Sequence, residues 1–436
     1  MKKYFSTLLV LLTFSGLSFA QLSMTPNRYT PELLWKLGRV SDIQVSPDNK
    51  TLLYGVSWYN LAENKGNRDL YSLPVAGGNA YKVTKFKGGE NNGIFRPDGK
   101  KIAFLSAESG TTQIWEANPD GSQAVCISNT GADISGFSYS PDMKQILYTQ
   151  RVKLDKTVND LYTDLPKANA RIEDDLMYRH WDSWADFSYS HIFVANYSEG
   201  KLELGKDIME NQRFESPMAP WGGMEQISWS PQSDKIAYTC KKLVGVEYTL
   251  STNSEIFVYD LKTNTEIVVS KGIAGYDQDP VFSPDGKKLV WRSMARDGFE
   301  ADKDRIMIYD FTLGKYTDFS EKFDQGANNF TWSDDSKILY FLSSIHGTVQ
   351  IYSINIASKE IKQITNGPWD YLSIALAGKD IIASKQSMIM PTEIFKIDAL
   401  GKETQLSFTN KEILKDIRSA KVEERWMTTT DNKKML

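Results

Sequence analysis

The chain has 436 residues, of which 41% are hydrophobic and 24% charged, a composition typical of a folded globular protein and not of a disordered one. Its 51 basic and 55 acidic side chains give a net charge of -4, so the charge balance does not indicate a nucleic-acid partner. Two cysteines and three histidines are too few for a disulfide scaffold or a four-cysteine metal site, and we expect neither metal nor cofactor.

The first 20 residues have the pattern of a secretory signal peptide. A cationic head, Met1 to Lys3, precedes an apolar run from Leu8 to Leu12 and the small-x-small sequence Ser18-Phe19-Ala20. The apolar run is too short to span a bilayer. We therefore expect export to the periplasm or the medium, with cleavage before Gln21; a buried N-terminal helix is the alternative interpretation.

Residues 21–39 form the expected N-terminal extension of the fold. Within it, the segment Thr30 to Leu37 predicts a short helix. Thr30 is a favourable N-cap residue, and Pro31 suits the first helical position because its missing N–H has no partner there in any helix.

A strand-turn-strand signature recurs along the next part of the chain. Its centre is Ser-Pro-Asp followed by Gly or Asn, in which Pro presets φ, Asp caps the turn and Gly or Asn accepts the left-handed conformation. Copies begin at Val45, Phe95, Tyr139, Trp229, Phe282 and Trp332, and a degenerate seventh copy runs from Ala377 to Asp380.

A second strand motif also occurs seven times, and it begins at Asp69, Gln113, His191, Glu255, Arg305, Gln350 and Glu393. Two strands from each motif give four strands per repeat with a period of about 43 to 50 residues, which is typical of a β-propeller. The sequence thus predicts an all-β fold, a propeller of seven four-stranded blades over residues 40–410. Eight blades are the alternative.

The third repeat is longer than the others. Pro141 of its turn and Ile192 of its second motif are 51 residues apart, against about 17 to 25 in the other repeats. We therefore expect an insertion from about Arg151 to Ser188, and a smaller excess from about Met209 to Met224. Long segments kept in a compact repeat are functional or disordered, and the mixed aromatic and charged composition of Asp175 to Phe187 favours function.

The segment Ile172 to Trp184 holds the candidate site residues, an acidic triplet close to Arg, His and Trp side chains. We expect a helical hairpin with Asp175, Arg179 and Asp182 on one helical face. Carboxylates beside an aromatic wall can hold a cationic amine through charge and cation–π contacts. The alternative is that the Trp rings pack on the blade and the charges face solvent.

No other motif indicates catalysis. A serine hydrolase of the α/β type needs a Gly-x-Ser-x-Gly elbow, which the 436 residues lack, and the nearest match, Gly136 to Ser140, predicts a strand. Cys126 and Cys240 lie in repeats two apart, which favours two separate buried thiols over a disulfide. His346 precedes a Gly and is expected in a turn.

Residues 411–436 follow the last repeat. They predict a linker or short helix from Lys411 to Ile417, a strand from Val422 to Thr429, a turn at Asp431-Asn432 and a returning strand from Lys433. We interpret this ending as a hairpin cut short, and therefore expect the chain to be truncated.

The opening segment TPELLWKLGRVSDIQVSPDNKTLLY, the SPDGKK turns and the closing segment KVEERWMTTTDNKKML resemble the exported prolyl oligopeptidase family of serine peptidases. The dipeptidyl-peptidase and acylaminoacyl-peptidase branch is the most similar. The resemblance covers nearly all of the mature chain. Its specificity comes from the opening and closing segments, because unrelated propellers also use such turns.

The resemblance implies that the propeller precedes an α/β-hydrolase domain, of which residues 411–436 are the linker and first strands. In this family the propeller covers the active site, limits access to short peptides and often supplies acidic residues for the substrate's free N-terminus. By resemblance the substrate-binding residues are Glu173, Asp174, Asp175, Arg179, His180, Trp181 and Trp184. A homo-oligomer would form through the parent protein.

The resemblance places no catalytic residue in this chain, which we predict to be inactive alone. The implied function is substrate gating and recognition for an exported serine exopeptidase that cleaves short peptides. The alternative is a stand-alone periplasmic propeller that binds other proteins, like the propeller component of the Tol envelope system.

Overall fold

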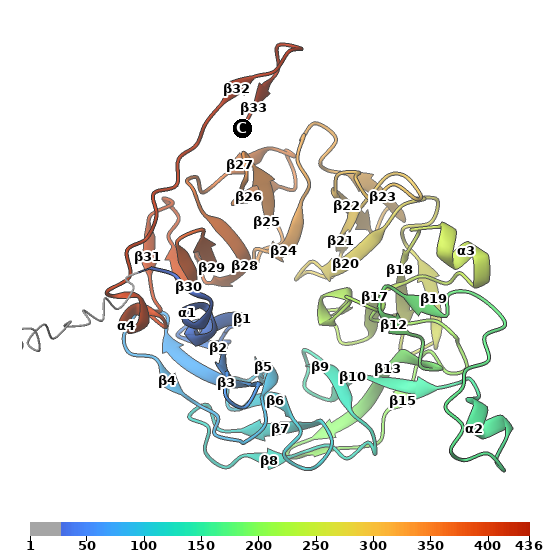
Figure 1. Ribbon diagram of the computed structural model, residues 1–436. Coiled ribbons are helices and arrows are strands. Elements are labelled where there is room, and N and C mark those ends of the chain that lie inside the picture. The colour runs from blue at the N-terminus through green and yellow to red at the C-terminus, as the bar shows by residue number, and fades with distance from the viewer. Residues whose placement is uncertain (1–27) are drawn as a thin grey trace, which may run out of the picture.

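The structure is a computed structural model that describes residues 28–436. It consists of twisted antiparallel sheets arranged radially in a ring, with their first strands toward the middle (Figure 1). This is a β-propeller, and the all-β prediction is confirmed. The expected signal peptide lies outside the described residues. Among the helices of residues 28–436, none is long and apolar enough to cross a membrane.

The first three sheets follow one another along the chain, and the third has a fifth strand. The first is β1 (Arg39–Val45), β2 (Thr51–Asn60), β3 (Lys65–Pro74) and β4 (Tyr81–Lys82). The second is β5 (Asn91–Phe95), β6 (Ile102–Ser106), β7 (Gln113–Ala117) and β8 (Val125–Cys126). The third is β9 (Ile134–Tyr139), β10 (Gln145–Lys153), β13 (Ser188–Ser198), β14 (Lys201–Leu202) and β15 (Lys206–Asp207).

Two further four-stranded sheets and one of eight strands complete the ring. The fourth is β16 (Ile227–Trp229), β17 (Lys235–Cys240), β18 (Glu255–Asp260) and β19 (Thr265–Val268), preceded by the 3-10 turn η1 (Met224–Gln226). The fifth is β20 (Asp277–Phe282), β21 (Lys288–Ser293), β22 (Arg305–Asp310) and β23 (Lys315–Asp318).

The eight-stranded sheet has two halves joined by a single parallel residue pair, Val349 with Asp370. One half is β24 (Asn328–Trp332), β25 (Ile338–Ile345), β26 (Thr348–Asn355) and β27 (Ile361–Gln363). The other is β28 (Asp370–Ala377), β29 (Asp380–Ser387), β30 (Met390–Ile397) and β31 (Glu403–Gln405).

Side-chain hydrogen bonds hold the repeated turns between first and second strands. In the turn after β1, the Ser46 hydroxyl donates to Asp48 at 2.6 Å, and Asn49 follows at a φ of 60°. The equivalent hydroxyl–carboxylate pairs are Ser140 with Asp142, Ser283 with Asp285 and Ser333 with Asp335. The predicted turn chemistry is therefore confirmed.

A hydrogen bond recurs at the second repeated motif in six of its seven copies. The backbone N–H of the motif's Ile or Leu, within the third strand, donates to a Ser or Thr hydroxyl just beyond the fourth, as from Ile256 to Ser270 at 2.9 Å. The same bond recurs from Leu70 to Thr84, Ile114 to Ser128, Ile306 to Ser320, Ile351 to Thr365 and Ile394 to Ser407. It satisfies a buried donor in these repeats.

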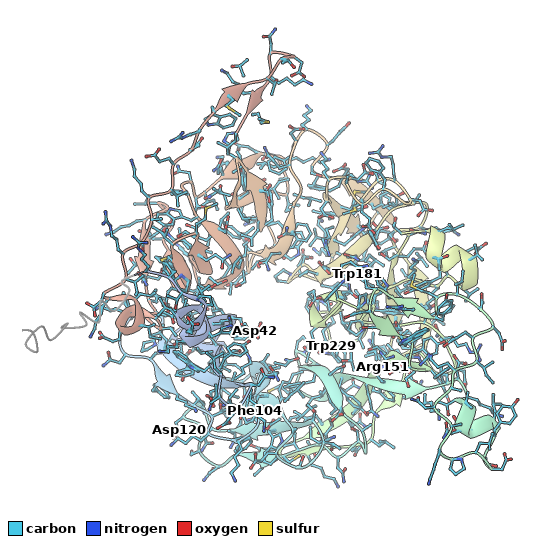
Figure 2. The ribbon with its side chains drawn as sticks, viewed as in Figure 1. Asp42, Phe104, Asp120, Arg151, Trp181 and Trp229 are labelled. Atoms are coloured by element: carbon cyan, nitrogen blue, oxygen red, sulfur yellow. The ribbon has the colours of Figure 1, made fainter. Side chains whose placement is uncertain are left out.

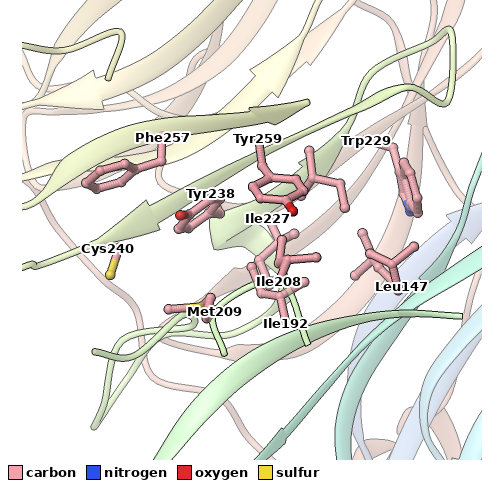
Figure 3. Packing of buried hydrophobic residues seen from close by; sticks show 12 residues of the cluster. Leu147, Ile192, Ile208, Met209, Ile227, Trp229, Tyr238, Cys240, Phe257 and Tyr259 are labelled. Carbon is pink, nitrogen blue, oxygen red and sulfur yellow. The ribbon is translucent and has the colours of Figure 1, made fainter. Parts of the chain in front are cut away.

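Apolar residues of neighbouring sheets interdigitate to form the core. Between the third and fourth sheets, Ile192 packs with Trp229, Tyr238 and Phe257 (Figure 3). Each of these side chains is under 10% exposed. The core is thus a series of inter-sheet layers, which is why the sheets stand radially.

The ring closes without a strand exchanged between its ends in the described part of the chain. β1 packs against β28 and β30, and Val40 and Leu52 share a buried cluster with Ile382 and Ile394. Two hydrogen bonds complete the seam: the Gly38 N–H donates to Asn410 Oδ1 at 2.8 Å, and Asn410 Nδ2 donates to the Gly38 carbonyl at 2.9 Å.

The segments at the ends of the chain agree only in part with expectation. The predicted helix is α1 (Pro31–Lys36), capped by the Thr30 hydroxyl, and α4 (Lys411–Leu414) begins the C-terminal segment. The predicted C-terminal hairpin forms, with β32 (Met427–Thr428) and β33 (Lys434–Met435). The strand prediction is wrong from residue 422 to 426, because no neighbouring strand in residues 28–436 supplies hydrogen bonds there.

The two thiols also differ from expectation. Both are free, but only Cys240 is buried; Cys126 is exposed. The prediction of a buried Cys126 is wrong because β8 is the outermost strand of its sheet and faces solvent. His346 lies in the tight turn between β25 and β26 with a φ of 48°, so the prediction of a turn there is confirmed.

A buried carboxyl group in the fifth sheet makes stability depend on pH. Asp277 is fully buried, accepts a hydrogen bond from Trp291 Nε1 at 2.7 Å, and burial raises its pKa to about 7. Because this value lies above that of the unfolded chain, the folded state binds the proton more tightly. This contribution to stability is therefore present below about pH 4 and is lost as the pH rises through about 7.

Asp277→Asn is therefore expected to flatten the pH dependence, because the amide keeps the shape of the side chain but does not titrate. In urea unfolding at pH 5 and pH 8, the variant should lose less stability at pH 8 than the unmodified chain. Burial also raises the pKa of Glu90 to about 7. In both proteins this group therefore makes the free energy of unfolding fall as the pH rises. Parallel pH curves for the two would contradict the prediction.

Candidate functional site

The insertion in the third repeat lies on one face of the ring together with two neighbouring connections. Because the strands of each sheet are antiparallel, every connection from a second to a third strand emerges at the same end of the sheets. The insertion, 154–187, is such a connection. It contacts the segment 208–226, which links the third sheet to the fourth, and the connection 241–254, which carries α3 (Gly245–Leu250). We call these three segments the loop face.

Both ends of the described chain contact the same side of the ring. The Tyr29 hydroxyl donates to the carbonyl of Ile389, and the His346 ring lies 4.9 Å from that of Trp426. Ile389 and His346 each belong to a connection from a second to a third strand. Both contacts therefore lie at the same end of the sheets as the loop face.

The expected helical hairpin is wrong. The insertion contains one short helix, α2 (Val158–Leu161), and the candidate residues lie in an irregular segment followed by a small hairpin of β11 (Arg179–His180) and β12 (Ser183–Trp184). Tyr, Trp, His, Asp and Ser are weak helix formers, whereas the hairpin gains a stacked Tyr178–Trp184 pair at 5.9 Å. Asp175, Arg179 and Asp182 therefore share no helical face.

Ion pairs anchor the insertion at its base. The Arg151 guanidinium bonds the carboxylates of Asp186, at 2.5 Å, and of Glu215, at 3.2 Å, and so joins the insertion to the connection 208–226. A second pair joins Arg213 to Asp155. The sequence shows that both segments are longer than in the other repeats. It does not show that they contact each other.

The three acidic candidates are all exposed but are not equivalent. Glu173 accepts from Arg171 Nε at 2.7 Å, so its charge is already compensated. Asp175 accepts from the Leu176 backbone N–H at 2.8 Å and lies against Gly245, where a Cβ would be 2.8 Å from its Oδ1. The Asp174 carboxylate makes no side-chain hydrogen bond or ion pair with residues 28–436.

Aromatic rings gather on the loop face. Trp181 is 74% exposed and lies 5.6 Å from Trp221, a residue of the connection 208–226 that sequence reasoning missed. His180 is half-buried, with its ring 6.0 Å from that of Trp181. Figure 2 shows Trp181 toward the middle of the ring, while Asp120 lies at its outer rim.

An open hollow of about 750 Å³ lies beside this wall, lined by Leu176, Met177, Tyr178, Arg179, Trp181, Trp184 and Thr249. Thr249 comes from α3, so the hollow is shared between the insertion and the fourth sheet's connection. The guanidinium of Arg179 lies 5.5 Å from the centre of the Trp184 ring. Apolar and aromatic surface with few polar groups suits a small organic ligand or a peptide side chain.

The structure thus brings Arg179, Trp181 and Trp184 to one hollow and leaves Asp174 free on the same exposed segment. Within residues 28–436, no three His, Cys, Asp or Glu side chains gather as a metal site. The arrangement can pair a cation with a carboxylate, and it can cover apolar groups with aromatic rings. Its chemistry is that of recognition, for which an exposed loop cluster on a rigid ring is well suited.

The radial sheets define a β-propeller, and the loop face is its candidate binding surface. A family model described as the TolB beta propeller domain matches residues 38–232 and 224–413. The chain belongs to this family of propeller domains, and it is a propeller of the prolyl oligopeptidase family, as the sequence resemblance implied.

Two curated relatives carry the name Dipeptidyl-peptidase 5. That of Porphyromonas gingivalis is 38% identical over 413 residues, which are 94% of this chain and 60% of the relative. That of Porphyromonas endodontalis is 36% identical over 408 residues, 93% of this chain and 59% of the relative. The chain thus spans about 60% of the length of these relatives.

Solved structures show the same fold at low identity. The acylaminoacyl peptidase of Pyrococcus horikoshii superposes with a TM-score of 0.68 at 18% identity, covering 90% of this chain and 56% of that one. The β-propeller domain of the Trilobed protease from Pyrococcus furiosus gives a TM-score of 0.57 at 15% identity, covering 86% and 99%.

Proposed function

We propose that this chain is the substrate-recognition and gating propeller of an exported serine exopeptidase of the dipeptidyl-peptidase type. Its partner is an α/β-hydrolase domain that holds the catalytic groups, and its substrates are short peptides. The observation that carries the proposal is the loop face, where a free carboxylate, an aromatic wall and a hollow lie on the side of the ring that the C-terminal segment contacts. The names of the curated relatives support it.

Two further features belong to the proposal. The halves of the eight-stranded sheet are separate blades, which makes seven in all, because one residue pair is a small link compared with the ladders inside each half. The chain is exported to the periplasm or the medium, which the N-terminal sequence supports.

We assign the substrate's free ammonium group to the acidic triplet, with Asp174 as its main partner. Asp174 is the member without a partner among residues 28–436, whereas Glu173 is paired with Arg171 and Asp175 lies against Gly245. An exposed pair would contribute under about 1 kcal/mol, but a charge-assisted bond partly covered by a catalytic domain contributes about 1.5 to 3 kcal/mol.

Asp174→Asn in the full-length peptidase is therefore expected to lower kcat/KM for a free-amine dipeptidyl substrate about ten- to a hundredfold. An N-blocked substrate should lose little, because it presents no ammonium group. Glu173→Gln and Asp175→Asn should give smaller effects, and Asp182→Asn, whose carboxylate lies in the turn of the hairpin, is the matched control. Equal losses on both substrates would indicate a folding role, and no loss from any of the triplet would place the amine elsewhere.

A further inference from the structure

The hollow on the loop face has a positive charge, which has no role in binding the substrate's ammonium group at the acidic triplet. Of the seven residues that line it, Arg179 is the one with a charged side chain. Its guanidinium faces the Trp184 ring at 5.5 Å and is exposed. The acidic triplet does not line the hollow, and the Asp175 carboxylate lies against Gly245 on α3 instead. The hollow is therefore cationic and aromatic.

Arg179 differs from two other arginines on this side of the ring in having no compensating carboxylate within residues 28–436. Arg171 also lies over the Trp184 ring, at 5.2 Å, but it is paired with Glu173. Arg296 lies 3.7 Å from the centre of the Phe299 ring and is paired with Asp302. An arginine held by an aromatic ring and left without an anion is oriented for one that arrives from outside.

We infer that this hollow binds the carboxylate of a short peptide, with Arg179 as the anion partner and the Trp rings covering the adjoining apolar side chain. The inference rests on the proposed function for its substrate class and adds a second anchor to it. Guanidinium and carboxylate match as a bidentate pair, and the Trp184 ring holds the guanidinium in place for it. The carboxylate is the C-terminal group of the peptide, and an acidic side chain is the other source of the same chemistry.

The two anchors together select for length. A peptide whose ammonium group meets the acidic triplet and whose carboxylate meets Arg179 is held at both ends by one insertion. Amidation of the C-terminus removes the second anchor without changing the apolar contacts. A short free peptide should therefore bind better than its amide.

The test is a titration of the 436-residue chain with Ala-Phe-Leu, Ala-Phe-Leu-amide and Ala-Asp-Leu-amide, followed by tryptophan fluorescence. We expect the free acid to bind about tenfold more tightly than Ala-Phe-Leu-amide, which corresponds to about 1.4 kcal/mol. If Ala-Asp-Leu-amide binds as well as the free acid, the hollow takes a side-chain carboxylate instead of the terminal one, and the assignment to the C-terminus is wrong.

Arg179→Gln should remove the difference between acid and amide, and Arg179→Lys should keep part of it. Arg296→Gln is the matched control, since this arginine lies over an aromatic ring but is already neutralised; it should leave the tenfold ratio unchanged. Equal binding of acid and amide to the unmodified chain, or absence of binding of either, overturns the inference. Because this readout is binding and not hydrolysis, a full-length protein without peptidase activity would contradict the proposed function while leaving the carboxylate site testable.

Discussion

Replacing Arg96 by Ala is expected to lower the free energy of unfolding by about 3 to 5 kcal/mol, the range for breaking a buried ion pair on one side. Arg96 occupies the position that Ser holds in the other repeated turns, and its side chain is 5% exposed. It donates to Asp98 at 2.8 Å and faces Glu116, which is 2% exposed, at 3.9 Å. Without the guanidinium, the Glu116 carboxylate stays buried without a counter-charge.

The neighbours of Glu116 cannot replace the guanidinium charge. The hydroxyls of Tyr139 and Tyr197 both donate to its Oε1 at 2.5 Å, so they satisfy hydrogen bonds and leave the negative charge uncompensated. Urea unfolding measures the decrease in stability. Ser46→Ala, at the same turn position of the first repeat, is the control and should cost about 1 kcal/mol. A decrease below about 1 kcal/mol for Arg96→Ala would show that the pair is not important for stability.

Replacing residues 154–187 by Asn-Gly is expected to abolish peptide binding and to leave the ring folded. Lys153 and Ser188 are the last residue pair of the β10–β13 ladder, so a two-residue type I′ turn can close the hairpin there. The variant lacks both the acidic triplet and Arg179. Because the Arg179 anchor alone is expected to contribute about tenfold, binding falls at least about tenfold.

The ring should tolerate this change because the ion pairs that the replacement removes are mostly exposed. Arg151 is 45% exposed and Asp186 56%, and such pairs contribute under about 1 kcal/mol each. A melting temperature within a few degrees of the unmodified chain is the expected result. Unfolding of the variant would mean that the insertion is part of the core, and the functional interpretation would lose its support.

The ring of four-stranded repeats could be predicted because its signals are local. The turn Ser46 to Asn49 forms through its own side chains, and the sequence therefore reveals it without knowledge of the rest of the fold. The insertion is different. Its conformation depends on contacts such as Trp181 with Trp221 and Asp175 with Gly245, which lie far apart in the sequence. A helical pattern in residues 172–184 could not reveal those partners.

The candidate residues likewise include some that local sequence could indicate and others that depend on distant contacts. Arg179, Trp181 and Trp184 could be chosen from composition, because a cluster of charged and aromatic side chains in an insertion favours function. The sequence could not predict that Arg171 neutralises Glu173. Only one of many conformations of this segment brings Arg171 Nε to 2.7 Å from the Glu173 carboxylate. Thr249 of α3 carried no sequence signal for its place in the hollow.

In the proposed function, the insertion on the loop face recognises short peptides for a peptidase. The most direct measurement is a parallel titration of the unmodified 436-residue chain and of the variant with Asn-Gly in place of residues 154–187, using Ala-Phe-Leu and its N-acetylated form. We predict that the unmodified chain binds the free-amine peptide more tightly than the acetylated one, and that the folded variant binds neither. Equal binding of the peptides by both proteins would contradict the claim.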